Sequence, residues 1–115
     1  MATQQWIMIA GPYRSGASTA EQRRENLKRL NEAALAIFRK GHVPVIGVNM
    51  ALPVIEAAGA GSYDEIMMPI SLALAERCDA IVRVGGASEG ADREVEWIRS
   101  RGGLVYASLS EIPGV

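Results

Sequence analysis

The chain has 115 residues, of which 49% are hydrophobic and 22% charged, with a formal net charge of −1 at pH 7. That length predicts one domain over residues 1–115, and the balanced charge without a basic block argues against a nucleic-acid partner. The lone cysteine, the lack of an apolar run as long as a membrane span and an N-terminus without signal-peptide character predict a cytoplasmic protein with no membrane partner. One histidine and one cysteine, far apart, predict no metal site, and we expect no cofactor.

The first half of the chain predicts two strands joined by a helix. Residues 6–10 are apolar and are bounded by Gly11-Pro12, which favours a strand. Ser18-Thr19-Ala20-Glu21 is typical of a capping box, and apolar residues then recur at helical spacing until Gly41. Residues 43–48 form the second predicted strand.

The middle of the chain is the least regular part. Residues 49–61 are compatible with a short helix and a mobile loop. Ser62-Tyr63-Asp64-Glu65 resembles a second capping box, but Pro69 would interrupt a helix that began there. We therefore expect the helix over residues 69–77, with Pro69 in its first turn.

The last third predicts a strand over residues 79–84, a helix over residues 89–101 and a final strand over residues 104–107. Strands that alternate with helices imply a parallel sheet with helices on both faces. We expect a three-layer α/β fold with a sheet of four or five strands.

The most informative stretch runs from Val84 to Glu94, where an apolar strand stops at Gly85-Gly86 and a Ser-x-Gly precedes a helix. Ligands of open α/β sheets bind at the carboxyl edge of the strands, and a helix N-terminus there favours an anion. Glu94 follows within about one helical turn, where the helix dipole would favour its ionised form. Such a site suits a phosphorylated substrate and a nucleophilic or basic glutamate.

Several motifs in chain order carry a family resemblance: Ile9-Ala10-Gly11-Pro12-Tyr13, Asn26, Gly41-His42-Val43-Pro44, Cys78-Asp79-Ala80-Ile81 and Ser88-x-Gly90-x-x-x-Glu94. Together they resemble the nucleoside 2-deoxyribosyltransferase superfamily, in particular its small bacterial branch of uncharacterised domains and the deoxynucleoside 5′-monophosphate N-glycosidases. The resemblance covers nearly the whole chain. It implies a flavodoxin-like or Rossmann-like fold and cleavage of an N-glycosidic bond through a glycosyl-enzyme ester.

The resemblance also implies roles for individual residues. Glu94 takes the position of the nucleophile, and Ser88 with Gly90 indicates a phosphorylated ligand, because an aspartate at position 88 would repel a phosphate. The loop that begins at Gly11 would close over sugar and base, and Arg14 could pair with a phosphate or a base carbonyl. The full set of candidate site residues is Gly11, Pro12, Tyr13, Arg14, Ser88, Gly90 and Glu94, with Asn49, Asp64 and Ser71 as further candidates.

Two positions depart from the family pattern. Family enzymes resemble one another in a first-strand tyrosine, which is Met8 here, and in an aspartate whose place is taken by Ser71. Serine is not an acid at neutral pH, and Asp64 could substitute for the missing aspartate. The departures favour a second hypothesis, a catalytically silent nucleotide-binding or sensor module.

A third hypothesis is a Rossmann-like nucleotide phosphoribohydrolase, which this chain resembles in Gly85-Gly86 but not in the glycine-threonine pair that usually precedes the glutamate. Simpler readings also stand: Glu94 could be a solvated helix residue, and the paired glycines could only form a turn. We expect structural roles for Asn26, His42, Cys78 and Asp79.

The irregular middle region also predicts an assembly. It carries six apolar residues that a domain of this size would bury in part between subunits: Leu52, Pro53, Val54, Ile55, Met67 and Met68. Related proteins are dimers or higher oligomers, so we expect a symmetric homodimer as the minimum, with a small-molecule nucleotide or nucleoside as ligand.

Overall fold

The computed structural model describes residues 3–115; Met1 and Ala2, with which the N-terminus begins, lie outside the described residues. The strands are β1 (Trp6–Ala10), β2 (Val43–Val45), β3 (Ala80–Arg83) and β4 (Leu104–Tyr106). The α-helices are α1 (Ala20–Arg39), α2 (Gly47–Ala58), α3 (Tyr63–Glu76) and α4 (Glu89–Ser100). Short 3₁₀ helices, η1 (Ala60–Ser62) and η2 (Leu109–Glu111), complete the described chain.

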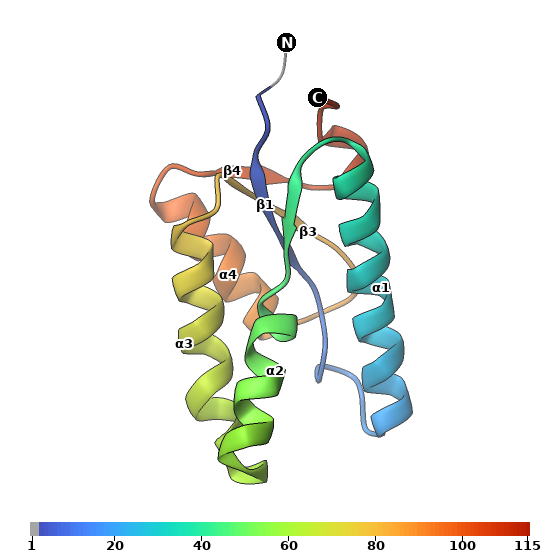
Figure 1. The fold of residues 1–115 in the computed structure, drawn as a ribbon, viewed down its shortest axis with the longest axis vertical. Coiled ribbons are helices and arrows are strands. Elements are labelled where there is room, and N and C mark those ends of the chain that lie inside the picture. The colour runs from blue at the N-terminus through green and yellow to red at the C-terminus, as the bar shows by residue number, and fades with distance from the viewer. Residues whose placement is uncertain (1–2) are drawn as a thin grey trace.

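The four strands form a parallel sheet in the order β2-β1-β3-β4, with α1 on one side and α3 and α4 on the other (Figure 1). Successive residues of a strand point to opposite faces, and β1 follows this rule. Ile7 and Ile9 pack towards α1, whereas Met8 and Ala10 pack towards α3 and α4. The expected three-layer α/β fold is confirmed, with four strands.

The strand order places a topological switch point between β1 and β3. The chain leaves β1 towards β2 on one side and reaches β3 on the other, so the loops after β1 and β3 meet at the carboxyl edge of the sheet. The two loops pack closely at their glycines. A Cβ atom at Gly11 would lie 2.8 Å from the Val84 carbonyl oxygen, and one at Gly85, whose φ is +76°, would lie 2.9 Å from Pro12 Cδ.

The second strand is shorter than predicted because a helix starts where the strand was expected to continue. β2 ends at Val45 and α2 begins at Gly47, so the short helix expected within residues 49–61 extends over residues 47–58. Ala51 and Ile55, one turn apart, are buried against Met67 of α3. This packing stabilises the helix despite Pro53 in its interior.

The prediction of a helix over residues 69–77 is also wrong at its start. α3 begins at Tyr63 and contains Pro69, which is exposed. Met67, Ser71 and Ala75 recur every four residues on its buried face, and this packing outweighs the backbone hydrogen bond that proline cannot donate. Ser62 makes no side-chain cap, so the second expected capping box is absent.

The first capping box lies one residue later than predicted. The Thr19 hydroxyl accepts a hydrogen bond from the Gln22 backbone N–H at 3.1 Å, and the Gln22 side chain accepts one from the Thr19 N–H at 3.2 Å. Gln22 thus does what Glu21 was expected to do, and α1 begins at Ala20. The amide oxygen of glutamine serves as well as a carboxylate in this motif.

The residues expected to be structural have structural contacts. His42 is 1% exposed; its Nδ1 accepts from the Gln5 N–H at 3.0 Å, so Nε2 donates to the Pro113 carbonyl at 2.6 Å. The Asp79 carboxylate accepts from the Trp6 N–H at 2.8 Å and fixes the start of β1. Cys78 is buried, and this burial raises the pKa of its thiol to about 11.

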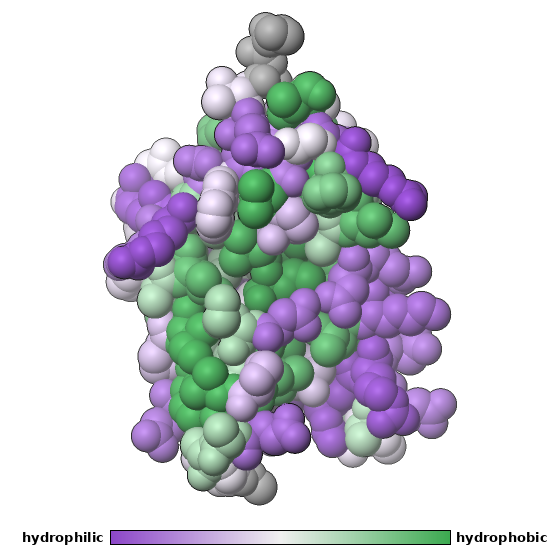
Figure 2. All heavy atoms as spheres, in the orientation of Figure 1, coloured by the Kyte–Doolittle hydropathy of each residue, from purple (hydrophilic) through white to green (hydrophobic). Residues whose placement is uncertain are grey.

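The apolar residues of the middle region divide into two groups. Ile55 and Met67 are buried within the chain, so these two of the six residues considered for an interface are not free to contact a second subunit. Met50 and Val54, one turn apart on α2, are 55% and 45% exposed. Figure 2 shows hydrophobic residues gathered over α2 and α3 and hydrophilic residues along α1. Within residues 3–115, no helix is long and apolar enough to cross a membrane.

Candidate functional site

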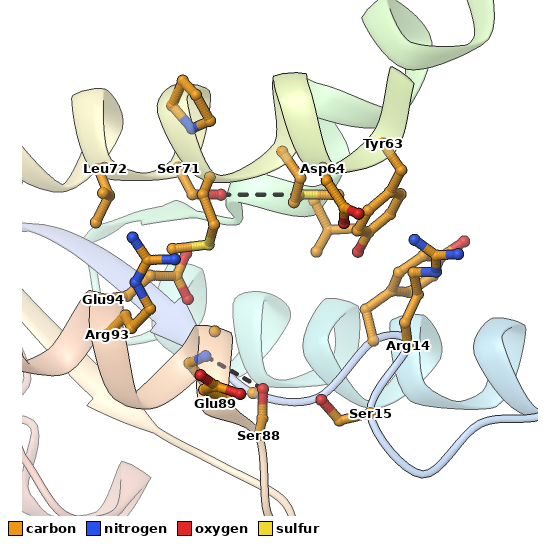
Figure 3. Close-up of a pocket in the computed structure, with 18 residues that line it drawn as sticks. Arg14, Ser15, Tyr63, Asp64, Ser71, Leu72, Ser88, Glu89, Arg93 and Glu94 are labelled. Carbon is orange, nitrogen blue, oxygen red and sulfur yellow. Dashed lines mark hydrogen bonds between the residues drawn. The ribbon is translucent and has the colours of Figure 1, made fainter. Parts of the chain in front are cut away.

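A cavity of about 630 Å³ opens at the carboxyl edge of the sheet, between the loop after β1, α3 and the first turns of α4 (Figure 3). Its polar and charged lining comes from these three segments: Tyr13, Arg14, Ser15, Tyr63, Asp64, Ser71, Ser88, Glu89, Arg93 and Glu94. Apolar walls come mainly from α3: Met67, Met68, Pro69 and Leu72. The cavity thus lies beside the switch point, where open parallel sheets bind ligands.

The floor of the cavity is the N-terminus of α4. Ser88 is the N-cap residue, and its hydroxyl oxygen accepts a hydrogen bond from the Ala91 N–H at 3.1 Å. The hydroxyl hydrogen is left to donate to a ligand. The first N–H groups of a helix have no partner within the helix, and Glu89 and Gly90 occupy those first positions. This arrangement has the donors that an anion needs.

Arg83 holds the loop that leads to this helix, a role that the sequence analysis missed. Its guanidinium donates to the carbonyl oxygens of Val84 at 2.6 Å and Gly86 at 2.7 Å, and its Nε donates to Asp92 of α4 at 3.1 Å. One side chain therefore ties the end of β3, the glycine loop and α4 together. An arginine as the last residue of a buried strand before Gly-Gly was the available signal.

Glu94 faces the cavity from α4 and is only 9% exposed, so it is not a solvated helix residue. Burial raises the pKa of its carboxyl from 4.5 to about 7, although the Ser71 hydroxyl and the Arg83 charge lower it. The expectation that the helix dipole keeps Glu94 ionised is therefore wrong. Glu94 is the sixth residue of α4, and the dipole acts mainly within the first turn.

The far end of the cavity is closed by a contact between Arg14 and Tyr63. The Arg14 guanidinium lies over the Tyr63 ring, 4.0 Å from its centroid. Burial raises the pKa of the Tyr63 hydroxyl to about 12, so it remains a hydrogen-bond donor at neutral pH. The loop is anchored to α1, because the Asn26 side chain donates to the Tyr13 carbonyl oxygen at 2.8 Å. The expected structural role of Asn26 is confirmed.

The structure brings most of the sequence candidates together. Eight of them line the cavity: Gly11, Tyr13, Arg14, Asp64, Ser71, Ser88, Gly90 and Glu94. Two do not. Pro12 is buried and packs against Gly85, and the Asn49 amide donates to Asn31 of α1 at 2.8 Å.

Tyr63 and Arg93 line the cavity but were missed by the sequence analysis. Tyr63 was hidden because the helix that carries it was expected to start six residues later. Arg93 directly precedes the candidate nucleophile, and that position is compatible with a solvated helix face. Met8 is fully buried among apolar residues, so this position of β1 supplies no hydroxyl to the site.

Within the described residues, no three His, Cys, Asp or Glu side chains are placed to hold a metal ion together. Comparison of the chain with protein-family models and with curated proteins found no match.

Proposed function

We propose that the protein binds a nucleoside or deoxynucleoside 5′-monophosphate and cleaves or transfers its N-glycosidic bond, with Glu94 as the nucleophile. The observation that carries this proposal is the pairing of one buried carboxyl with an anion-binding helix N-terminus in the same cavity. A ligand that satisfies both has a phosphate at one end and an electrophilic carbon a few ångströms away. A nucleoside monophosphate has both.

In the proposed pose, the phosphate accepts hydrogen bonds from the Ser88 hydroxyl and from the N–H groups of Glu89 and Gly90. The sugar extends over the first turns of α4 towards Glu94. The base lies against the α3 wall, where Met68 and Leu72 offer apolar surface.

The chemistry follows from a carboxylate next to an anomeric carbon. An oxygen of ionised Glu94 bonds to the carbon while the C–N bond breaks and its electron pair leaves with the base, which takes a proton from solvent. Water then attacks the anomeric carbon of the ester, gives up a proton and regenerates the carboxylate; a second base in place of water gives transfer.

A second candidate function is a catalytically silent nucleotide-binding or sensor module. The raised pKa of Glu94 favours it, because more of this carboxyl is protonated, and hence not nucleophilic, at neutral pH than of an ordinary glutamate. The fully buried Met8 also favours it, since that position has no hydroxyl to aid the reaction.

Release of free base separates the candidates. The parent protein and Glu94→Gln are incubated with purine and pyrimidine nucleoside monophosphates, with Glu96→Gln as control, because Glu96 is exposed on the same helix. We expect base release from the parent and from Glu96→Gln, and a loss of several orders of magnitude in Glu94→Gln. A parent that binds but releases no base supports the silent module. Base release without a sugar trapped on Glu94 supports a phosphoribohydrolase instead.

We further propose that the protein works as a cytoplasmic homodimer. The exposed pair Met50 and Val54 supports an interface on α2. The single buried cysteine suits a reducing compartment.

A further inference from the structure

A buried carboxyl needs a donor to hold its ionised form, and the described charged groups around Glu94 offer little help. It forms no salt bridge with the described residues, since the ion pairs among them join Arg83 to Asp92 and Arg99 to Glu96. The ionisable groups that face it across the cavity are Tyr13, Arg14, Tyr63 and Asp64, with Glu89 and Arg93 on its own helix and Arg83 from β3.

The side chain next to Glu94 on the opposing helix is Ser71. Ser71 is 2% exposed and lines the cavity from α3, at the same end as Glu94, as Figure 3 shows. Its position is fixed from behind by the first residue of α2. A Cβ atom at Gly47 would overlap the Ser71 hydroxyl, so the backbone of α2 presses directly on this serine.

The hydroxyl has one hydrogen to donate and two acceptors in reach. One is the Met67 sulfur at 3.9 Å, which is a weak acceptor. The other is the Glu94 carboxyl, which lines the same cavity from α4 and whose pKa the Ser71 hydroxyl lowers. A hydrogen bond to a carboxylate is stronger than one to a thioether, so ionisation of Glu94 draws the hydroxyl towards it.

We propose that Ser71 is a positioning residue, whose hydroxyl donates a hydrogen bond to the Glu94 carboxylate and holds it in the orientation needed for attack. This role adds to the proposed function and rests on it, because it takes Glu94 to be the nucleophile. Ser71 itself makes no bond to the reacting atoms.

The test is a titration of the Glu94 carboxyl by carbon NMR in the protein without ligand, with Glu94→Gln to assign the signal. The variants are Ser71→Ala and the control Ser62→Ala, whose side chain makes no cap hydrogen bond at the start of α3. We expect a titration midpoint near pH 7 for the Glu94 carboxyl in the parent. This midpoint should rise by about one pH unit in Ser71→Ala and should be unchanged in Ser62→Ala. Circular dichroism should show both variants folded.

Activity adds a second readout. With a nucleoside monophosphate that the parent cleaves, Ser71→Ala should lower kcat several-fold at pH 7, leave KM unchanged and move the rising limb of the pH profile upward. An unmoved midpoint, an unfolded Ser71→Ala or a change in KM alone would overturn the role of Ser71. A shifted midpoint in a protein that releases no base would support Ser71 and count against the proposed function alone.

Discussion

The guanidinium of Arg14 stacks on the ring of Tyr63 at 4.0 Å, and this contact joins the loop after β1 to the first residue of α3. It closes the end of the cavity opposite Ser71 and Glu94 (Figure 3). The charge of Arg14 lies at that end of the cavity, where a ligand phosphate would compete with the ring for it.

Arg14→Ala should therefore weaken the binding of nucleoside monophosphates by roughly tenfold, because a charge-assisted hydrogen bond to phosphate is lost. Binding of the matching nucleosides, which lack the phosphate, should change much less. Calorimetric titration of both ligand classes checks this. Arg24→Ala, on the exposed face of α1, is the control. Equal losses for nucleoside and monophosphate would contradict a phosphate contact.

Substitutions of Ser88 should separate its structural role from its proposed binding role. Aspartate is as good an N-cap as serine, so Ser88→Asp should keep the stability of α4 while its charge repels a ligand phosphate. Ser88→Ala loses the N-cap hydrogen bond, so its free energy of unfolding should be about 1 kcal/mol lower than that of the parent. Urea unfolding and ligand titration of both variants are the measurements. If Ser88→Asp binds monophosphates as tightly as the parent, the proposed phosphate position at the N-terminus of α4 is wrong.

Glu94 should make the protein less stable as the pH rises. Its pKa is about 7 in the folded state against an ordinary 4.5, so the folded state binds the proton more tightly. Stability is then highest below pH 4.5 as far as this group is concerned, and falls as the pH rises to about 7. The full loss is of the order of 3 kcal/mol.

Glu94→Gln carries no such penalty. It should be more stable than the parent at pH 8 and differ little at pH 5, as measured by urea unfolding at both pH values. Glu96→Gln should follow the parent at both. A parent whose advantage over Glu94→Gln grows with pH would mean that Glu94 is stabilised in its ionised form.

His42 links the two ends of the described chain through the Gln5 N–H and the Pro113 carbonyl. His42→Ala would leave both groups without their partner and would open a hole under the C-terminal segment. We expect a loss of about 2 kcal/mol or more in the free energy of unfolding. Gln4→Ala, which removes an exposed hydrogen bond to Gly41, should cost far less. If both variants lose similar amounts of unfolding free energy, the burial of His42 adds nothing to the stability of the fold.

The proposed dimer is tested by light scattering at micromolar concentration. We expect a mass of twice the chain for the parent, and a monomer for the double variant Met50→Glu with Val54→Glu, because two charges on α2 would be buried against the partner. Leu35→Glu on α1 is the matched control, since Leu35 is also an exposed apolar helix residue. A monomeric mass for the parent protein would contradict the proposed interface on α2.

The sequence predicted the sheet, the first and last helices and most of the cavity, because these depend on local patterns. Glycine and proline mark the carboxyl end of β1, and Ser88 caps α4. Local patterns predicted the helix positions wrongly where packing between distant segments determines them. Pro53 and Pro69 lie inside helices that hold together through the mutual burial of Ile55 and Met67.

The ionisation of Glu94 was mispredicted for a related reason. Its helical position was read correctly, but burial depends on the opposing helix α3, which no spacing within α4 reveals. Asn49 shows the same limit, because its neighbour Asn31 lies 18 residues away on α1.

The contact between the glycine loops has a consequence for how the site can change over evolution. Side chains cannot be added at Gly11 or Gly85 without pushing Val84 or Pro12 aside, so this part of the cavity wall is closed to variation. Met68 and Leu72 on the α3 wall have flexible side chains and can be exchanged more freely. New ligand preferences would therefore arise by exchange of residues on α3, while the switch-point loops stay as they are.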